Sequence, residues 1–241
     1  MATESCQAIV LHSTPYGERG LLIETYTLEH GARAFFTIGA KSQRSGMRYA
    51  PYAHPLALVQ LGFRSKRGDG GLCQLVSVER SAPPGLLLTD MPRSAIALFL
   101  ASQLRRLLGQ QFENEELYRY CHEGIRLLGS PTAQLALFPQ AFLLGLCEQL
   151  GIRPQGHYSP STPRFDPQGG IFIPARHEAR SDELGARHLS TLMGGGYDTP
   201  PSAIPRAQRG ELLRLLMQYL EIHTGVRLPG EALDVLEDVW G

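Results

Sequence analysis

The feature of this sequence that most constrains its fold is a change in hydrophobic periodicity near residue 81. Before that point the apolar residues come in short runs, such as residues 21–27, which are rich in β-branched and aromatic side chains at close to period two. Beyond it the apolar residues recur at the three- and four-residue spacing of helices. The pattern predicts an α+β protein in which a strand-rich first part precedes a mainly helical second part.

The first third of the chain predicts a small β-barrel. We expect five short strands, at residues 8–12, 21–27, 34–38, 56–63 and 72–78. Turn-forming residues separate them, for example Gly68-Asp69-Gly70-Gly71. Among small barrels the five-stranded OB-fold fits this strand count and commonly holds oligonucleotides. We therefore expect an OB-fold nucleic-acid-binding domain over residues 1–80.

Residues 81–241 predict an all-α domain that follows a linker-like segment at residues 81–85. Ser130-Pro131 is a helix-start signal, and Pro139 predicts either a kink or a later true start for the same helix. Prolines and glycines interrupt the helical rhythm at about residues 153–200, where we expect an irregular insertion with one hairpin strand at residues 170–173. The helices are expected at residues 92–108, 114–128, 131–150, 183–193, 205–223 and 230–239.

The formal net charge of zero excludes a histone-like polycation, but the charges are unevenly placed. Residues 1–80 hold nine basic and six acidic side chains, and no acidic residue occurs between Glu29 and Asp69. A basic stretch of this kind on a neutral chain is typical of a module that binds a polyanion. The candidate DNA-binding residues are Arg33, Lys41, Arg44, Arg48, Arg64, Lys66 and Arg67.

Aromatic residues are interleaved with these basic residues and offer a second kind of contact, stacking on bases. Phe35 and Phe36 are adjacent in a predicted strand, so both cannot face outward. Alternate aromatic residues of a small barrel fill its core. We expect at most Tyr49 or Tyr52 to stack on a base.

No motif in the sequence predicts catalysis, a cofactor or a metal. The segment Gly39-Ala40-Lys41-Ser42 lacks the glycines of a phosphate-binding loop, and no nucleophile-elbow, zinc-protease or dinucleotide signature occurs. His157, His177 and His188 are too widely spaced to form a short chelating pair, and no thiolate lies near them. We expect a protein that is not an enzyme and that needs no cofactor.

The sequence also predicts a cytoplasmic protein with no membrane partner. The four cysteines form no C-x-x-C pair, which excludes a dense disulfide framework. The N-terminus lacks the basic start and long apolar stretch of a secretory signal. The longest apolar stretch, residues 135–147, is too short to span a bilayer. We therefore expect reduced thiols.

Several partial motifs, taken in order, resemble the RecO family of bacterial recombination mediators. In the first domain they are Ala8-Ile9-Val10-Leu11-His12, Tyr16-Gly17-Glu18, Thr27, Gly31, Gly39-Ala40-Lys41, Ser45, Pro55-Leu56, Leu72, Leu75 and Glu79. In the second they are Phe142, Leu144, Leu146, Leu150-Gly151, Pro154, Leu212-Leu213, Tyr219, His223, Leu233 and Leu236. The resemblance covers nearly the whole chain, and the ordered set rather than any single motif carries it.

This resemblance implies a DNA repair and recombination protein. It implies binding to single- and double-stranded DNA, annealing of complementary strands, and action with RecR to help load RecA onto DNA coated by single-stranded-DNA-binding protein. Many members of the family carry a four-cysteine zinc ribbon after the central helix. This chain has no cysteine beyond Cys147, so its insertion resembles a metal-free version of that ribbon.

The helix expected at residues 205–223 carries a second candidate site. Arg206, Arg209 and Arg214 lie near its start, beside leucines. One interpretation is a core helix with a solvated face, and the other is a groove for an acidic, apolar peptide. Relatives in the family bind the C-terminal tail of single-stranded-DNA-binding protein on this domain, so the three arginines are the candidate partner-binding residues.

Two other function classes remain open from the sequence. An RNA-binding OB-fold adaptor would use the same basic barrel, and a preference for structured RNA over single-stranded DNA would favour it. An enzyme using the histidine-bearing insertion, with or without a metal, is the other, and stoichiometric zinc in the pure protein would favour it.

Overall fold

The computed structural model describes residues 3–17, 20–37, 49–64, 72–175 and 182–230, together with Leu233 and Leu236. Its internal contacts divide the chain into two compact units. The barrel unit comprises Met1–Pro131 and Pro229–Gly241, and the helical unit comprises Thr132–Leu228. The domain boundary expected near residue 81 therefore falls inside the barrel unit, and it stays a prediction about which parts fold independently.

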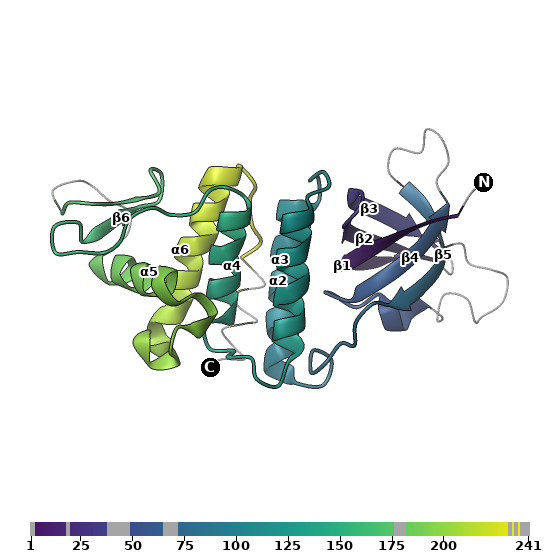
Figure 1. Ribbon diagram of the computed structural model, residues 1–241, viewed down its shortest axis with the longest axis horizontal. Helices are drawn as coiled ribbons and strands as arrows, with labels where there is room; N and C mark the ends of the chain where they lie inside the picture. The colour runs from purple at the N-terminus through teal and green to yellow at the C-terminus, as the bar shows by residue number, and fades with distance from the viewer. Residues whose placement is uncertain are drawn as a thin grey trace. The chain divides into compact units, whose positions relative to one another are not determined.

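The barrel unit begins with a closed barrel of five strands (Figure 1). They are β1 (Glu4–Tyr16), β2 (Gly20–Thr27), β3 (Gly31–Phe36), β4 (Leu58–Arg64) and β5 (Leu72–Arg80). Their order around the barrel is β1-β2-β3-β5-β4, and β3 pairs with β5 in parallel while the other pairs are antiparallel. The OB-fold expectation is confirmed.

Strand alternation assigns each barrel residue to the interior or to the outer face. Ile23 on β2, Phe35 on β3 and Cys73 on β5 are cross-strand partners that lie in the buried barrel core. Their strand neighbours point outward. The β1 register shifts between Val10 and His12, and this irregularity accompanies the passage of β1 from pairing with β4 to pairing with β2.

The barrel unit also contains two helices, α2 (Met91–Leu108) and α3 (Glu115–Gly129), which pack against each other and overlap in the view of Figure 1. The Asp90 side chain caps α2 by accepting from the Arg93 backbone N–H at 3.0 Å. The Asn114 side chain caps α3 by accepting from the Leu117 N–H at 3.0 Å. The start of each helix thus follows from a local sequence signal.

Arg93, only 7% exposed, joins the start of α2 to the end of α3. Its guanidinium donates to the carbonyl oxygens of Leu128 at 3.1 Å and Ser130 at 3.0 Å, and it pairs with the Asp90 carboxylate at 3.0 Å. These carbonyls at the end of α3 have no partner within their own helix. The buried guanidinium therefore has partners for its N–H groups, and the two carbonyl oxygens at the end of α3 each gain a donor.

The turn between β2 and β3 docks against the loop between α2 and α3. The Ala32 N–H donates to the Gln111 carbonyl oxygen at 2.9 Å, and the Tyr26 hydroxyl donates to the Phe112 carbonyl oxygen at 3.1 Å. Gly31 has φ +64°, and a Cβ there would lie 2.5 Å from the Gln111 oxygen. Only glycine fits this turn without displacing the loop.

The helical unit contains α4 (Phe138–Gln149), α5 (Glu183–Gly195) and α6 (Arg206–Thr224), and α4 and α6 pack side by side (Figure 1). The helix expected from residue 131 starts at Phe138 instead, with Pro139 in its first turn. Ser130 serves as the end of α3, because its N–H donates to the Leu127 carbonyl oxygen. The alternative of a later start at Pro139 is the one confirmed. Most of the helix expected at residues 230–239 lies outside the described residues.

The insertion expected at about residues 153–200 contains a two-stranded hairpin, β6 (Arg164–Asp166) and β7 (Ile171–Ile173), which confirms the strand expected at residues 170–173. The rings of Phe165 and Phe172 have centroids 5.2 Å apart, and Phe165 also contacts Tyr219 of α6. The Tyr219 hydroxyl donates to the Ile152 carbonyl oxygen at 2.6 Å. An aromatic cluster therefore anchors the insertion to the helices of its own unit.

Candidate nucleic-acid interface

Two of the seven candidate DNA-binding residues, Arg33 and Arg64, lie in the described part of the barrel. The other five, Lys41, Arg44, Arg48, Lys66 and Arg67, lie outside the described residues. Their proposed role rests on the sequence alone.

The Cβ of Arg33 points to the interior side of the barrel wall. It is the β3 partner of Thr25, which is 2% exposed, and it shares strand parity with the core residue Phe35. The Thr25 hydroxyl donates to the Arg33 carbonyl oxygen at 3.0 Å. Burial raises the pKa of the Cys6 thiol to about 12, and the charge of Arg33 opposes that rise. Arg33 therefore lies close enough to Cys6 for its positive charge to act on that thiol.

Arg64 is the last residue of β4, points to the outer face of the barrel, and is exposed. It pairs with Gln74 of β5, and Gln74 in turn pairs with Phe36 of β3. Phe36 pairs with Leu22 of β2, and Leu22 with Thr14 of β1. One cross-strand row thus runs over the outer face of the barrel, and we call these five residues the outer row. Arg33 and Arg64 consequently lie on opposite sides of the barrel wall.

The outer face next to this row carries an acidic side chain whose charge is compensated. Glu24 of β2 receives two hydrogen bonds from the Arg105 guanidinium of α2, at 2.5 and 2.7 Å. The pair is partly exposed, so its contribution to stability is small. Its consequence for binding is that Glu24 presents less repulsion to a phosphate than an unpaired carboxylate would.

The two tyrosines expected to stack on a base both contact other parts of the barrel unit. The Tyr49 hydroxyl donates to the Val76 carbonyl oxygen at 3.2 Å, and both Tyr49 and Tyr52 pack against the barrel core. The Arg80 guanidinium lies 5.6 Å from the centre of the Tyr52 ring and donates to the Pro51 carbonyl oxygen at 2.9 Å. Both residues are half-buried, and the expectation that one of them stacks on a base stays a prediction.

Two aromatic residues that were not expected to stack do lie on the outer face. Phe36 belongs to the outer row and is half-buried. Tyr16, at the end of β1, is 46% exposed, and its ring centroid lies 5.9 Å from that of Phe36. Strand alternation in the segment containing the core residue Phe35 is the sequence signal that places Phe36 outward.

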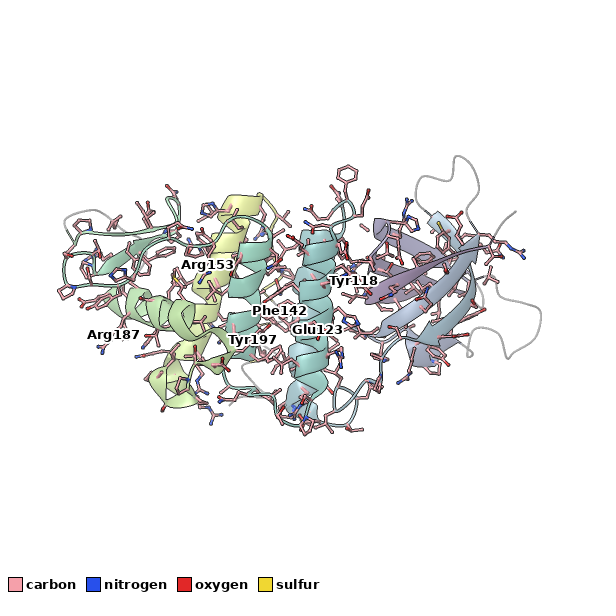
Figure 2. All side chains as sticks on the ribbon, viewed as in Figure 1. Tyr118, Glu123, Phe142, Arg153, Arg187 and Tyr197 are labelled. Carbon is pink, nitrogen blue, oxygen red and sulfur yellow. The ribbon has the colours of Figure 1, made fainter. Side chains whose placement is uncertain are left out.

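Elsewhere in the barrel unit, the outer face of β2 at Tyr26 lies against Tyr118 of α3. Tyr26 is fully buried although it points outward from the barrel, because its ring lies beside that of Tyr118, with centroids 6.5 Å apart. Figure 2 shows Tyr118 on the side of α3 that faces the strands. This part of the barrel surface is unavailable to a ligand.

A cavity of about 200 Å³ in the barrel unit was not foreseen from the sequence. Its lining includes the side chains of Arg80, Arg126 and His54, with apolar residues such as Leu56 and Ile125. Burial lowers the pKa of His54, and the nearby Arg80 charge lowers it further. Leu56 has φ +59° and is fully buried, so a strained backbone position contributes to the cavity wall.

The three candidate arginines of α6 differ in their surroundings, and their role in partner binding stays a prediction. Arg209 is committed to the preceding turn, because its guanidinium donates to the carbonyl oxygens of Ile204 at 3.2 Å and Pro201 at 2.8 Å. Arg206 and Arg214 are exposed. The neighbouring Leu212, Leu213 and Leu216 are buried.

The insertion contains hydroxyl groups and histidines but no thiol. The Ser159 hydroxyl lies 2.7 Å from that of Thr162, and it accepts from the Thr162 N–H at 3.1 Å. His157 and His188 lie in the same unit, while His177 is outside the described residues. Within the described ranges no group of three His, Cys, Asp or Glu side chains is placed to hold a metal ion.

All four cysteines are buried. Burial raises the pKa of Cys121 and of Cys147 to about 12, so these thiols are protonated and unreactive at neutral pH. Among the described helices none is long and apolar enough to cross a membrane.

Comparison with known proteins covers both parts of the chain. The family model "Recombination protein O N terminal" matches residues 1–83, and "Recombination protein O C terminal" matches residues 88–231. The DNA repair protein RecO of Christiangramia forsetii is 27% identical over 242 residues, covering 98% of each chain. That of Bacteroides fragilis is 27% identical over 96% of this chain and 97% of the relative. That of Porphyromonas gingivalis is 28% identical over 90% and 91%, respectively.

A closed five-stranded barrel followed by helices defines an OB-fold protein with an appended helical part. The two family matches together span most of the chain and meet where the barrel gives way to the helices. The chain belongs to the RecO family of DNA repair and recombination proteins.

Proposed function

We propose that this protein is a recombination mediator that binds single- and double-stranded DNA and anneals complementary strands. The observation that carries the proposal is a closed OB-fold barrel whose sequence lacks acidic residues between Glu29 and Asp69 and whose outer carboxylate Glu24 is paired with Arg105. The mechanism is electrostatic. Cations that neutralise phosphates on two strands lower the repulsion between them, so that complementary bases can meet.

We further propose that the protein acts with RecR to help load RecA onto DNA coated by single-stranded-DNA-binding protein. The family membership supports these partners. The acidic C-terminal tail of single-stranded-DNA-binding protein is proposed to bind the helical unit, with Arg206 and Arg214 as the exposed candidates on α6. Arg209 is a weaker candidate because its guanidinium already serves two carbonyl oxygens.

In this proposal the protein makes and breaks no covalent bond, uses no cofactor, and acts in the cytoplasm. Its thiols are buried. An RNA-binding adaptor is the second candidate, and no feature of the described barrel favours it over DNA binding. The two are separated by comparing affinities for single-stranded DNA and structured RNA of equal length and at equal salt.

The test of the proposed function is annealing of complementary oligonucleotides coated with single-stranded-DNA-binding protein. The key variant removes four cations by Arg44→Ala, Arg48→Ala, Lys66→Ala and Arg67→Ala. The control removes four exposed arginines elsewhere, by Arg106→Ala, Arg119→Ala, Arg153→Ala and Arg187→Ala. The two variants have the same net charge, so they differ only in where the charge is lost.

We expect the wild type and the control to anneal and the key variant, still folded by circular dichroism, to lose most of its annealing rate. DNA affinity should fall steeply with salt, because phosphate contacts release counterions. Equal loss in both variants would show that net charge alone matters and would remove the barrel from the mechanism. No annealing by the wild type would overturn the mediator proposal.

A further inference from the structure

The outer face of the barrel carries aromatic, amide and guanidinium groups in a fixed order, some exposed and some half-buried. Along the outer row, the half-buried Phe36 lies between Leu22 and Gln74, and Arg64 follows Gln74. Tyr16 lies next to Phe36 at the end of β1. Among the described residues of the five strands, Tyr16 is the only large apolar side chain that is exposed. Its contact with Phe36 makes the two rings an aromatic pair on the outer face of the barrel.

Backbone contacts hold the two aromatic residues in place. The Leu21 N–H donates to the Thr37 hydroxyl at 2.8 Å, and the Thr37 N–H donates to the Leu21 carbonyl oxygen at 2.9 Å. A Cβ on Gly20 would lie 2.5 Å from the carbonyl oxygens of both Thr37 and Tyr16, so the strand ends approach as closely as glycine permits. The ends of β1, β2 and β3 thus form a rigid support for Tyr16 and Phe36, and little ordering is needed when a ligand binds.

The two rings are inclined to each other at 54°, so they do not stack on one another. Aromatic faces on an OB-fold surface are the groups on which single-stranded nucleic acid stacks its bases. Arg64 lies two strands from Phe36, which the spacing of strands in a sheet puts at about 10 Å, and it offers a guanidinium to a phosphate. Gln74 lies between them with an amide that can both donate and accept.

We propose that Tyr16 and Phe36 form a base-stacking platform for single-stranded DNA, with Arg64 as the phosphate contact of the same row. This inference rests on the proposed function and deepens it. It proposes that the bases contact two aromatic residues that are not among the seven basic candidate residues. Duplex DNA has no unstacked bases to offer, so the platform favours single strands. The platform would hold the bases of a single strand on the two rings, while Arg64 contacts its phosphates, until a complementary strand arrives.

The experiment measures binding of two labelled oligonucleotides of equal length, an oligothymidine and an abasic sugar-phosphate chain. The variants are Tyr16→Leu, Phe36→Leu and the double variant, which keep apolar volume but remove the aromatic faces. The matched control is Phe112→Leu on the α2–α3 loop, because Phe112 is 84% exposed and lies outside the barrel strands. Arg64→Gln tests the phosphate contact, and thermal melting checks that each variant is folded.

We expect the wild type to bind oligothymidine more tightly than the abasic chain. The double variant should lose about five- to a hundredfold in affinity for oligothymidine and almost nothing for the abasic chain, with an unchanged salt slope. Arg64→Gln should weaken both ligands equally and lower the salt slope by about one. Phe112→Leu should bind as the wild type does. If Phe36→Leu does not fold, the exposed Tyr16→Leu alone carries the test.

Three outcomes contradict the platform. The preference for bases could survive the double variant, Phe112→Leu could cause the same loss, or an oligouridine could bind more tightly than oligothymidine with the same dependence on the two rings. The last result would reassign the platform to RNA. A wild type that binds neither oligonucleotide would instead reject the proposed function itself, so the two failures are distinguishable.

Discussion

At the scale of single residues, Gly31 shows how one position couples the barrel to the helices that follow it. Its positive φ and the 2.5 Å approach of the Gln111 oxygen both exclude a side chain. Two further contacts fix the turn: the Thr27 hydroxyl donates to the Gly31 carbonyl oxygen at 2.9 Å and accepts from the His30 N–H at 3.1 Å. The threonine and glycine of the family pattern thus have a structural reason.

We expect Gly31→Ala to destabilise the barrel unit by about 2–4 kcal/mol, because the new methyl group must displace the α2–α3 loop and occupy a left-handed conformation. Chemical denaturation measures the loss. Gly17→Ala is the control, since Gly17 also has positive φ but has nothing within 4 Å of the position that a new methyl group would take. The loss at Gly31 should exceed the loss at Gly17, and equal losses would show that backbone conformation alone, not the close approach, requires glycine there.

At the scale of secondary-structure elements, the sequence predicts strands well where one face is buried. The strand predicted at residues 21–27 corresponds to β2 (Gly20–Thr27), and the strand predicted at residues 72–78 corresponds to β5 (Leu72–Arg80). The strand expected from residue 56 begins at Leu58, because Leu56 has φ +59° and its N–H donates to the Val10 carbonyl oxygen. That deviation is a tertiary contact, and local propensity carries no information about it.

The candidate site was less predictable than the fold, because it too depends on tertiary contacts. Composition identified a basic stretch, but it could not tell that Arg33 starts on the interior side of the barrel and Arg64 on the outer face. Alternation around the core residue Phe35 is a signal within the sequence itself, and it separates Arg33 from Phe36. The pairing of Glu24 with Arg105, 81 residues apart, has no local signal at all.

The contact between α2 and α3 offers a test at this scale. Arg93→Lys keeps the charge but loses the planar fork that reaches two carbonyl oxygens, so we expect a loss of about 2–3 kcal/mol. Thermal unfolding measures it, and Arg106→Lys on the exposed face of α2 should change stability by less than about 0.5 kcal/mol. A similar melting temperature for both variants would show that the buried hydrogen bonds contribute little.

At the scale of the whole molecule, the chain returns to its first unit after building the second. The Gln103 side-chain amide of α2 donates to the Pro229 carbonyl oxygen at 3.2 Å, and Leu233 and Leu236 are buried in the barrel unit. The barrel unit therefore consists of two segments that are far apart in the sequence. Its stability depends on residues that the periodicity of the first 131 residues cannot reveal.

This arrangement predicts which unit responds to a cavity at the C-terminal segment. Leu236→Ala should cost about 2–5 kcal/mol and should speed amide hydrogen exchange in α2 and α3, while exchange in the β6–β7 hairpin stays unchanged. Leu220→Ala, at a fully buried position of α6, is the reciprocal variant and should speed exchange in the hairpin and α4 instead. Hydrogen-exchange mass spectrometry on both full-length variants separates the two patterns. If Leu236→Ala loosened the hairpin as much as α2, the two units would unfold as one cooperative body, and the C-terminal segment would stabilise the whole chain rather than the barrel unit alone.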